Sequence, residues 1–485
     1  MAQDNDDWLD NLAIYEETNG ETALEVRDIQ NPFEFIPIEV CHRILVYLPD
    51  VTSLVSAALS CRALYETLKD GEHIIVRSVL INSFGLSVLP VATLAYKCSP
   101  PYLSTNPTFS PGYPSDRQVR LLKRYLFDFI GNLERPTPLR TRLSLRDAIA
   151  LDTYHHGVVS KLAQKFIKAC ARTSSSCPLG IKRSLRKLPF STWEWDRVFR
   201  SLYHFEIFRK LFGCLGFMEN DIKHLVMVFF AKFAPWENAQ LATIHDFLAD
   251  QVMPAFDDIA RHDVTWGKHL VDFDVGGYDA RIQHLLTLGL EKIQLISSAD
   301  SYKDREALLK AGKEMPPGEA ATFLAYLLDT IDDLNPQQGE GAAIFNASPF
   351  FLDEDSGAEK IWRISLAHDR NRRFAIYEEL DWLYRARGYV FWDQKRLQIL
   401  GALDSPWKPA RRSAVVVHSA HASELMYSWH VRAGIYDWGG RGYWAKGDES
   451  QIIWEQNERE PEPHVEPKSL EEAKHFWRVL RANNW

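Results

Sequence analysis

The chain lacks hydrophobic runs that could cross a lipid bilayer, and it contains few cysteines. Its longest purely apolar runs, such as residues 225–231, are far shorter than the roughly 20 residues of a membrane helix. The six cysteines form no Cys-x-x-Cys pair, and a chain of 485 residues does not need disulfides to fold. Residues 4–10 carry four aspartates instead of the basic-then-apolar pattern of a secretion signal. We therefore expect a soluble intracellular protein, located in the cytoplasm, the nucleus or both.

Motifs of common enzymes and repeat proteins are also missing. Residues 439–442 (Gly-Gly-Arg-Gly) lack the spacing of a dinucleotide loop, and the Gly-Lys pairs at 267–268 and 312–313 lack the upstream glycine of a phosphate loop. Neither His-Glu-x-x-His nor Gly-x-Ser-x-Gly occurs, and leucine-rich, WD40 and kelch repeats are absent. We expect a chain without its own catalytic site, cofactor or metal, although residues 115–485 are long enough to hold an uncharacterised enzyme.

Two groups of side chains have the chemistry of metal ligands without the usual pattern. Three histidines lie in or near one predicted helix, and three aspartates surround Gly276-Gly277 without the spacing of a calcium loop. Hydrogen-bonded packing histidines and a polar turn are the alternatives that we favour. The residues are His418, His421, His430, Asp272, Asp274 and Asp279.

The net charge of −9 hides two blocks of opposite sign. Residues 1–30 hold nine acidic residues against Arg27 alone, whereas residues 117–210 hold twenty Lys or Arg against seven Asp or Glu. The basic block is compatible with a nucleic-acid surface or, around residues 182–187, with a nuclear-import patch. Solvated helix faces that balance acidic neighbours explain it equally simply, and we favour that interpretation.

Residues 35–65 have the most distinctive pattern, because they predict three short helices with more apolar surface than thirty residues can bury alone. Pro37 suits the first turn of a helix, and Glu39 in the same turn favours the helix dipole. Apolar residues then recur at helical spacing until Pro49, and Asp50 can cap the next helix. Arg62 opens the third helix. Small helical units with surplus apolar faces usually dock on a partner.

This pattern resembles the F-box, the adaptor-binding module of Skp–cullin–F-box ubiquitin ligases. The matching positions are Ile36-Pro37, Glu39, Ile44, Leu48, Leu54 and Cys61-Arg62, with Ile36 as a mild departure from leucine. The resemblance implies a Skp-type adaptor as partner, with a cullin bound through it. The adaptor-binding residues that it implies are Ile36, Pro37, Glu39, Ile44, Leu45, Leu48, Leu54, Cys61 and Arg62.

The remaining chain divides into segments of different composition. Gly85 predicts the end of a helix over residues 72–84, and Ser191 to Glu194 form a capping box that opens a helix ending at Gly213. Similar apolar spacing predicts helices over 220–231, 237–249, 280–296, 304–311, 318–334, 371–387, 418–431 and 469–482. The predicted segments are 1–30 (acidic tail), 31–70 (F-box), 71–114 (linking helices and a Pro-rich loop), 115–334 (helical domain), 335–360 (linker) and 361–485 (Trp-rich region).

The C-terminal region holds ten of the fifteen tryptophans and is similar to the C-terminal regions of fungal F-box proteins. Glycines in residues 432–454 are expected to break any regular element there. Tyr, Trp and Arg dominate binding hot spots, so we consider Trp438, Arg441, Tyr443 and Trp444 as candidate target-binding residues. The competing interpretation is that these rings fill the core.

Together these observations predict a mainly α protein: an N-terminal three-helix F-box, then a large helical region and an aromatic-rich, partly irregular C-terminal region. The resemblance implies the substrate-recognition subunit of a ubiquitin ligase, which acts in protein ubiquitination without catalysing it. One alternative is a scaffold that binds the adaptor without a ligase. We expect a target protein as the second partner, no membrane partner and no nucleic acid.

Overall fold

The computed structural model describes most of the chain between residues 36 and 454. The described ranges are 36–99, 116–131, 142–171, 188–213, 220–269, 271, 280–310, 328, 338–351, 353–367, 382–403 and 416–454. The predicted acidic tail, the Pro-rich loop and the predicted helices over 318–334 and 469–482 lie largely or wholly outside these ranges.

Contacts divide the chain into two units that do not follow the sequence continuously. The first comprises Met1–Pro90 and Thr137–Thr153, and the second comprises Val91–Pro136 and Tyr154–Trp485. Both units are helical, which confirms the predicted mainly α class. The division joins a remote segment, residues 137–153, to the N-terminal helices.

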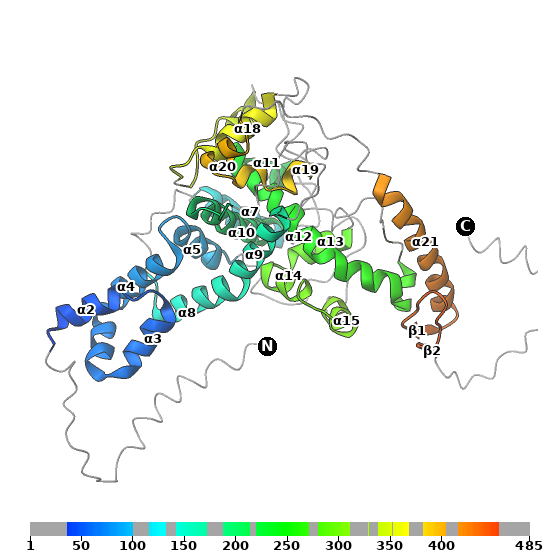
Figure 1. Cartoon of the computed structure of the whole chain (residues 1–485), viewed down its shortest axis with the longest axis horizontal. Helices are drawn as coiled ribbons and strands as arrows, with labels where there is room; N and C mark the ends of the chain where they lie inside the picture. Colours follow the sequence, from blue (N-terminus) through cyan, green and yellow to red (C-terminus); the bar gives the residue numbers. More distant parts are fainter. Residues whose placement is uncertain are drawn as a thin grey trace, which may run out of the picture. The chain divides into compact units, whose positions relative to one another are not determined.

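The first unit is built on one long helix with two shorter ones packed against it. Helices α2 and α3 both contact α4, and Figure 1 shows the three together in blue. Asp50 caps α3 as predicted, because its Oδ1 accepts a hydrogen bond from the Ser53 N–H at 2.7 Å. The helices are α2 (Ile38–Val46), α3 (Val51–Ser60), α4 (Arg62–Phe84) and α8 (Leu145–Tyr154).

Helix α4 joins two predicted helices into one. It runs from Arg62 through a single non-helical residue, Gly71, and ends at Gly85, whose φ of 80° suits only glycine well. A Cβ on Gly71 would lie 3.1 Å from the ring of His42 in α2. Glycine at position 71 therefore lets α2 approach α4 closely at the kink.

The second unit contains the remaining elements. They are α5 (Leu89–Lys97, which begins at the unit boundary), α7 (Asp116–Gly131), η2 (His155–Val159), α9 (Ser160–Ala171), α10 (Thr192–Phe212), α11 (Asn220–Phe230), α12 (Pro235–His262), η4 (Val264–Lys268), α13 (Ala280–Thr287), α14 (Leu290–Ile296), α15 (Tyr302–Lys310), α17 (Gly339–Phe345), α18 (Gly357–Ala367), α19 (Trp382–Arg385), η7 (Tyr389–Phe391), α20 (Gln394–Ile399), α21 (Val416–Asp437), β1 (Gly440–Gly442) and β2 (Ile452–Trp454).

Helices α10 and α12 pack against each other and carry many of the buried side chains of this unit. The predicted capping box is present: the Glu194 N–H donates to the Ser191 hydroxyl, and the Ser191 N–H donates to the Glu194 carboxylate. The same carboxylate pairs with buried Arg396 of α20 at 2.6 Å. A residue predicted only as a cap therefore also joins two segments about two hundred residues apart.

Arg197 of α10 connects the helix to two loops. Its fully buried guanidinium donates to the carboxylates of Asp353 and Asp355 at 2.7 Å each. It also donates to the carbonyl oxygens of Phe391 and Trp392 at 3.2 and 2.9 Å. Burial alone would raise the pKa of Asp355, but the hydrogen bonds from Arg197 and from backbone N–H groups outweigh burial, and its pKa is lowered.

Four predicted elements differ from the structure. The segment predicted as a linker, residues 335–360, contains helix α17 and the start of α18. The helix over 280–296 is broken into α13 and α14, because Gly289 has a φ of 97° and lies against the guanidinium of Arg209. The helix expected to end at Ala249 continues to His262, since its buried stripe continues past that residue. The prediction of no regular element over 432–454 was wrong: α21 passes through Gly434, and a short hairpin follows.

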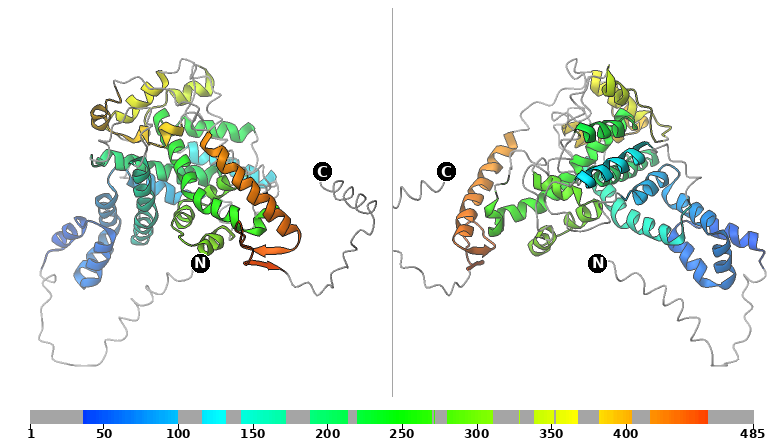
Figure 2. Two further views of the ribbon diagram at one scale, coloured as in Figure 1. Left: turned by 45° about the vertical axis from the view of Figure 1, so that its right-hand side comes forward. Right: turned by 180° about the vertical axis from the view of Figure 1, so that it is seen from behind.

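The hairpin of β1 and β2 lies beside the C-terminal end of α21 in both views of Figure 2. The strands are antiparallel, with Arg441 opposite Ile453. Gly439 before β1, Gly442 at its end and Gly447 in the loop between the strands have φ values of 89°, 93° and 84°, which favour glycine, so these glycines accommodate the hairpin rather than abolish it. Its inner face packs on Val264, with Trp444 and Ile452 buried there.

Among the described residues, no single helix is both long enough and apolar enough to cross a membrane. In the part of the chain that the structure describes, the consecutive helices α4 and α5 reach the required length and composition only when they are taken together.

Burial of His204 predicts a loss of stability in mild acid. Its ring stacks on Phe233 at 3.9 Å, its Nε2 is buried without a hydrogen-bond partner, and burial lowers its pKa to about 3. The unfolded chain takes up this proton near pH 6.5. Between those pH values the unfolded state binds more protons than the folded state, so the free energy of unfolding decreases as the pH decreases. The free energy of unfolding should decrease between pH 7 and pH 5, and we expect His204→Phe to make this decrease smaller by about 2 kcal/mol. Urea unfolding at the two pH values measures the difference.

Comparing the variant with the unmutated chain at each pH separates the contribution of His204 from that of groups whose protonation has the opposite effect on stability. Glu237 is one such group, because burial raises its pKa to about 7 and it therefore favours the folded state in acid. His430 is exposed on α21, so His430→Gln serves as the matched control. An identical pH dependence in the His204→Phe variant and the unmutated chain would contradict the prediction.

Candidate adaptor-binding surface

Helix α2 presents apolar side chains on two faces. Cys41 and Leu45 are buried against the other helices of the first unit. Val40, Ile44 and Tyr47 follow one another at spacings of four and three residues, which places them on a second stripe. These three remain 44 %, 37 % and 80 % exposed. The stripe formed by Val40, Ile44 and Tyr47 is called the α2 stripe below.

Backbone carbonyls at both ends of α2 have defined partners. Pro37 stands at the N-cap, one position before the first turn in which it was predicted, and its carbonyl oxygen accepts hydrogen bonds from the N–H groups of Val40 and Cys41. At the other end, the side-chain amide of Asn82 in α4 donates to the carbonyl oxygens of Val46 and Leu48, both at 2.9 Å. Both ends of the helix are therefore held, one of them by a neighbouring helix.

The residues predicted to bind the adaptor occupy three kinds of environment. Leu45 and Leu54 are completely buried within the first unit, so in this structure they support the helix packing and offer no free surface. Arg62 is exposed and pairs with Glu66 at 2.7 Å within α4. The exposed positions are Pro37, Glu39, Ile44 and Arg62, the half-buried ones are Ile36, Leu48 and Cys61, and the buried ones are Leu45 and Leu54.

Two residues of the α2 stripe, Val40 and Tyr47, were not among the predicted site residues. The signal for them was present, because apolar or aromatic residues recur at 40, 44 and 47 with helical spacing. A second stripe at 41, 45 and 48 runs beside it, and the sequence does not state which of the two faces the helix α4. The structure assigns 41 and 45 to the interior.

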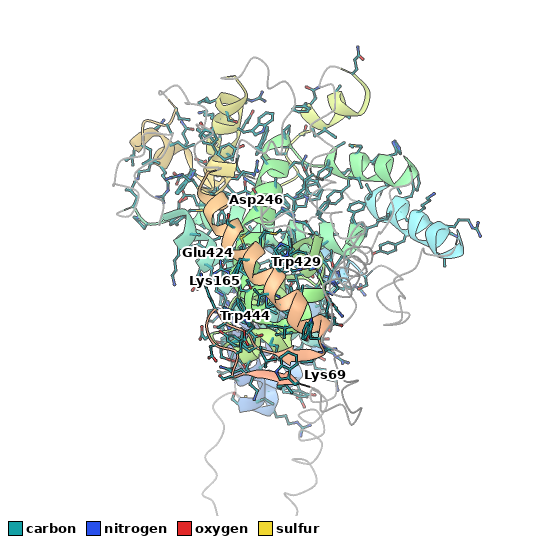
Figure 3. The ribbon with its side chains drawn as sticks, turned by 90° about the vertical axis from the view of Figure 1, so that its right-hand side faces the viewer. Lys69, Lys165, Asp246, Glu424, Trp429 and Trp444 are labelled. Carbon is teal, nitrogen blue, oxygen red and sulfur yellow. The ribbon has the colours of Figure 1, made fainter. Side chains whose placement is uncertain are left out.

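The four candidate target-binding residues do not form one surface. Trp438 is 78 % exposed at the end of α21, whereas Trp444, labelled in Figure 3, is 5 % exposed in the core beneath the hairpin. The ring of Tyr443 stacks on His262 at 4.8 Å. Arg441 folds over the ring of Tyr436. Trp438 therefore remains the accessible ring, and the structure adds the exposed strand residues Ile453 and Trp454, which the sequence interpretation missed.

A small polar pocket in the second unit is lined by Arg200, Glu237 and Asp353 among others. The carboxylate of Glu237 accepts hydrogen bonds from the N–H groups of Ala234, Phe350 and Phe351 at 2.7–2.9 Å. Arg200 pairs with Asp353 at 3.1 Å. These contacts hold Phe350, Phe351 and Asp353 against α10 and α12. A structural role therefore explains them without a bound ligand.

No group of three potential metal ligands gathers within the described residues. The aspartates at 272, 274 and 279 lie outside those residues, as do the side chains of His418 and His421. In the basic block, Arg197 and Arg200 are buried and paired with acidic groups, so these two charges are not available to a nucleic acid.

Comparison with protein-family models decides the nature of the N-terminal helices. Residues 33–75 match the F-box-like family. The chain contains an F-box-like domain. F-box domains bind Skp-type adaptors in ubiquitin-ligase complexes, and F-box proteins are typically non-catalytic receptors. No curated protein and no solved structure shows significant similarity to this chain.

The matched segment covers α2, α3 and the first half of α4. The F-box-like domain therefore ends inside a helix, a few residues beyond the kink at Gly71. The second half of α4 and the remote segment 137–153 belong to the same structural unit but lie outside the match.

Proposed function

We propose that this chain is the substrate-recognition subunit of a Skp–cullin–F-box ubiquitin ligase. The F-box-like domain binds the Skp-type adaptor, and the second unit holds a target protein. The chain then acts by proximity: it raises the effective concentration of the target near the conjugating enzyme, and other subunits carry out the ubiquitin chemistry. This function needs no catalytic residue in the chain and is compatible with a cytoplasmic or nuclear location.

The observation that carries the proposal is the exposed α2 stripe within a segment that matches the F-box-like family. Exposed apolar side chains gathered on one helix mark a protein-interaction site. Tyrosine adds a large ring with a polar hydroxyl, a combination that is enriched at interfaces. We assign the direct adaptor contacts to the α2 stripe, with Pro37 and Glu39 beside it. Leu45 and Leu54 contribute by holding the helices in place.

For the target we propose the exposed apolar side chains at the C-terminal hairpin. Trp438, Ile453 and Trp454 are 78 %, 67 % and 51 % exposed. These large apolar side chains come from the residue that follows α21 and from β2, which pairs with β1 beside the end of α21 (Figure 3). Trp444 is buried and the half-buried ring of Tyr443 stacks on His262, so we assign neither of them to direct target contact.

Co-purification of the intact chain with a Skp-type adaptor and a cullin tests the proposal and its main rival. We expect the adaptor to bind directly and the cullin to bind only when the adaptor is present. Binding of the adaptor without recruitment of the cullin would support a scaffold outside the ligase. Failure of the adaptor to bind would contradict both functions.

A further inference from the structure

The side chain of Asn82 bridges two backbone carbonyl groups of a distant segment. Asn82 lies near the end of α4, beyond the residues that match the F-box-like family. Its single Nδ2 atom donates to the oxygens of Val46 and Leu48, each at 2.9 Å. Since that nitrogen carries two hydrogens, it can serve both acceptors. One amide thus holds the chain on both sides of Tyr47.

This bridge lies at the C-terminal end of α2, where backbone carbonyl groups need hydrogen-bond partners from outside the helix. The last four carbonyl groups of a helix lack partners within the helix. The segment then meets Pro49, which has no N–H group. Tyr47 between the two bonded carbonyls is 80 % exposed. The direction in which its ring projects therefore depends on how the end of α2 is held.

We propose that Asn82 is a positioning residue for adaptor binding, which clamps the end of α2 so that Tyr47 and Ile44 face the adaptor together. The inference rests on the proposed function. It extends the working adaptor-binding unit beyond the family match, to the end of α4.

The second half of α4, which carries Asn82, is itself held by hydrogen bonds to α8. Oε1 of Glu72 accepts a hydrogen bond from the Leu145 N–H at 2.8 Å, at the start of α8, where a negative charge is favourable. The hydroxyl of Ser83, next to Asn82, donates to Asp152 at 3.3 Å. These bonds tie both ends of the second half of α4 to α8. The clamp is therefore built on a braced helix.

The size of the effect follows from the population of the clamped state. If only a fraction of molecules holds α2 in the competent position, the apparent Kd rises by the inverse of that fraction. Two neutral hydrogen bonds at an exposed site each make a modest net contribution, and together they account for a change of about tenfold in the apparent Kd. We expect loss of the clamp to weaken adaptor binding by about that factor, chiefly because the complex forms from fewer competent molecules.

Asn82→Asp and Asn82→Leu in the full chain test the clamp. Both variants keep the size of the side chain and remove its N–H donors. We expect each to raise the Kd for the adaptor about tenfold near pH 7.5. As the pH falls toward about 4, close to the ordinary pKa of aspartate, about half of the introduced carboxyl groups take up a proton and regain one O–H donor. Affinity should then recover in Asn82→Asp, relative to the unmutated chain at the same pH, and not in Asn82→Leu.

Ser78→Ala is the matched control, because its hydroxyl donates only to Ile74 within α4; it should bind as the unmutated chain does. Equal affinity of the unmutated chain and both Asn82 variants would overturn the proposal. So would a general loss of affinity with no recovery in acid for Asn82→Asp, since that result indicates structural damage alone. Lack of adaptor binding by the unmutated chain would instead remove the proposed function, and the clamp assignment with it.

Discussion

Replacing Ile44 and Tyr47 together by aspartate is expected to weaken adaptor binding at least a hundredfold without unfolding the chain. Both side chains are exposed in the free protein, at 37 % and 80 %, so the folded state loses little packing. Burial of a large apolar side chain contributes about 1.5–3 kcal/mol, and about 1.4 kcal/mol corresponds to a tenfold change in Kd. The aspartates also bring unpaired charge into an apolar interface.

The measurement is the Kd for the Skp-type adaptor, with circular dichroism as the check on folding. Leu121 and Phe127 of α7 are 51 % and 69 % exposed in the second unit. Leu121→Asp/Phe127→Asp is therefore the matched control, and it should retain full affinity. A folded Ile44→Asp/Tyr47→Asp variant that binds the adaptor normally would show that the α2 stripe is not the interface.

The second large effect concerns folding: Arg197→Met is expected to lower the free energy of unfolding by about 3–5 kcal/mol. The guanidinium is 0 % exposed and joins α10 to the carboxylates of Asp353 and Asp355 and to three backbone carbonyl groups. Methionine fills much of the space but leaves the carboxylates without their main partner. A lone lysine cannot reproduce the forked geometry, so Arg197→Lys should recover only part of the loss.

Urea unfolding measures this effect, and Arg363 provides the control. Arg363 pairs with Glu359 on the surface of α18, where the two side chains are 63 % and 37 % exposed. Exposed pairs of this kind contribute about 0–1 kcal/mol, so Arg363→Met should change stability little. Similar losses for the two variants would mean that the buried arrangement of Arg197 does not stabilise the fold as proposed.

Local rules predicted many features of the chain correctly. Asp50 caps α3, Ser191 and Glu194 form a capping box, and helices end at Gly85 and Gly213 as expected. Each of these features depends on residues within one helical turn, so the sequence contains the whole interaction. The helical class follows for the same reason, since apolar spacing reports directly on a helix face.

The errors arose where distant residues decide the outcome. The break at Gly289 involves Arg209 from another helix. The hairpin at 440–454 forms because Val264, far earlier in the chain, gives its inner face a core to cover. Glycine spacing alone predicted irregular structure there, although a glycine with positive φ is also what a tight turn requires.

The sequence by itself determined the helical class, the F-box resemblance and the set of apolar residues from which an interface could be made. Tertiary structure alone decided which of those residues face outward. The stripes at 40, 44, 47 and at 41, 45, 48 are both apolar, and only packing of α2 on α4 buries Cys41 and Leu45 of the second. In the same way, burial of Trp444 and exposure of Trp438 depend on where the hairpin folds. The physical reason is that the exposure of a side chain depends on the residues that pack around it, and these residues are distant in the sequence.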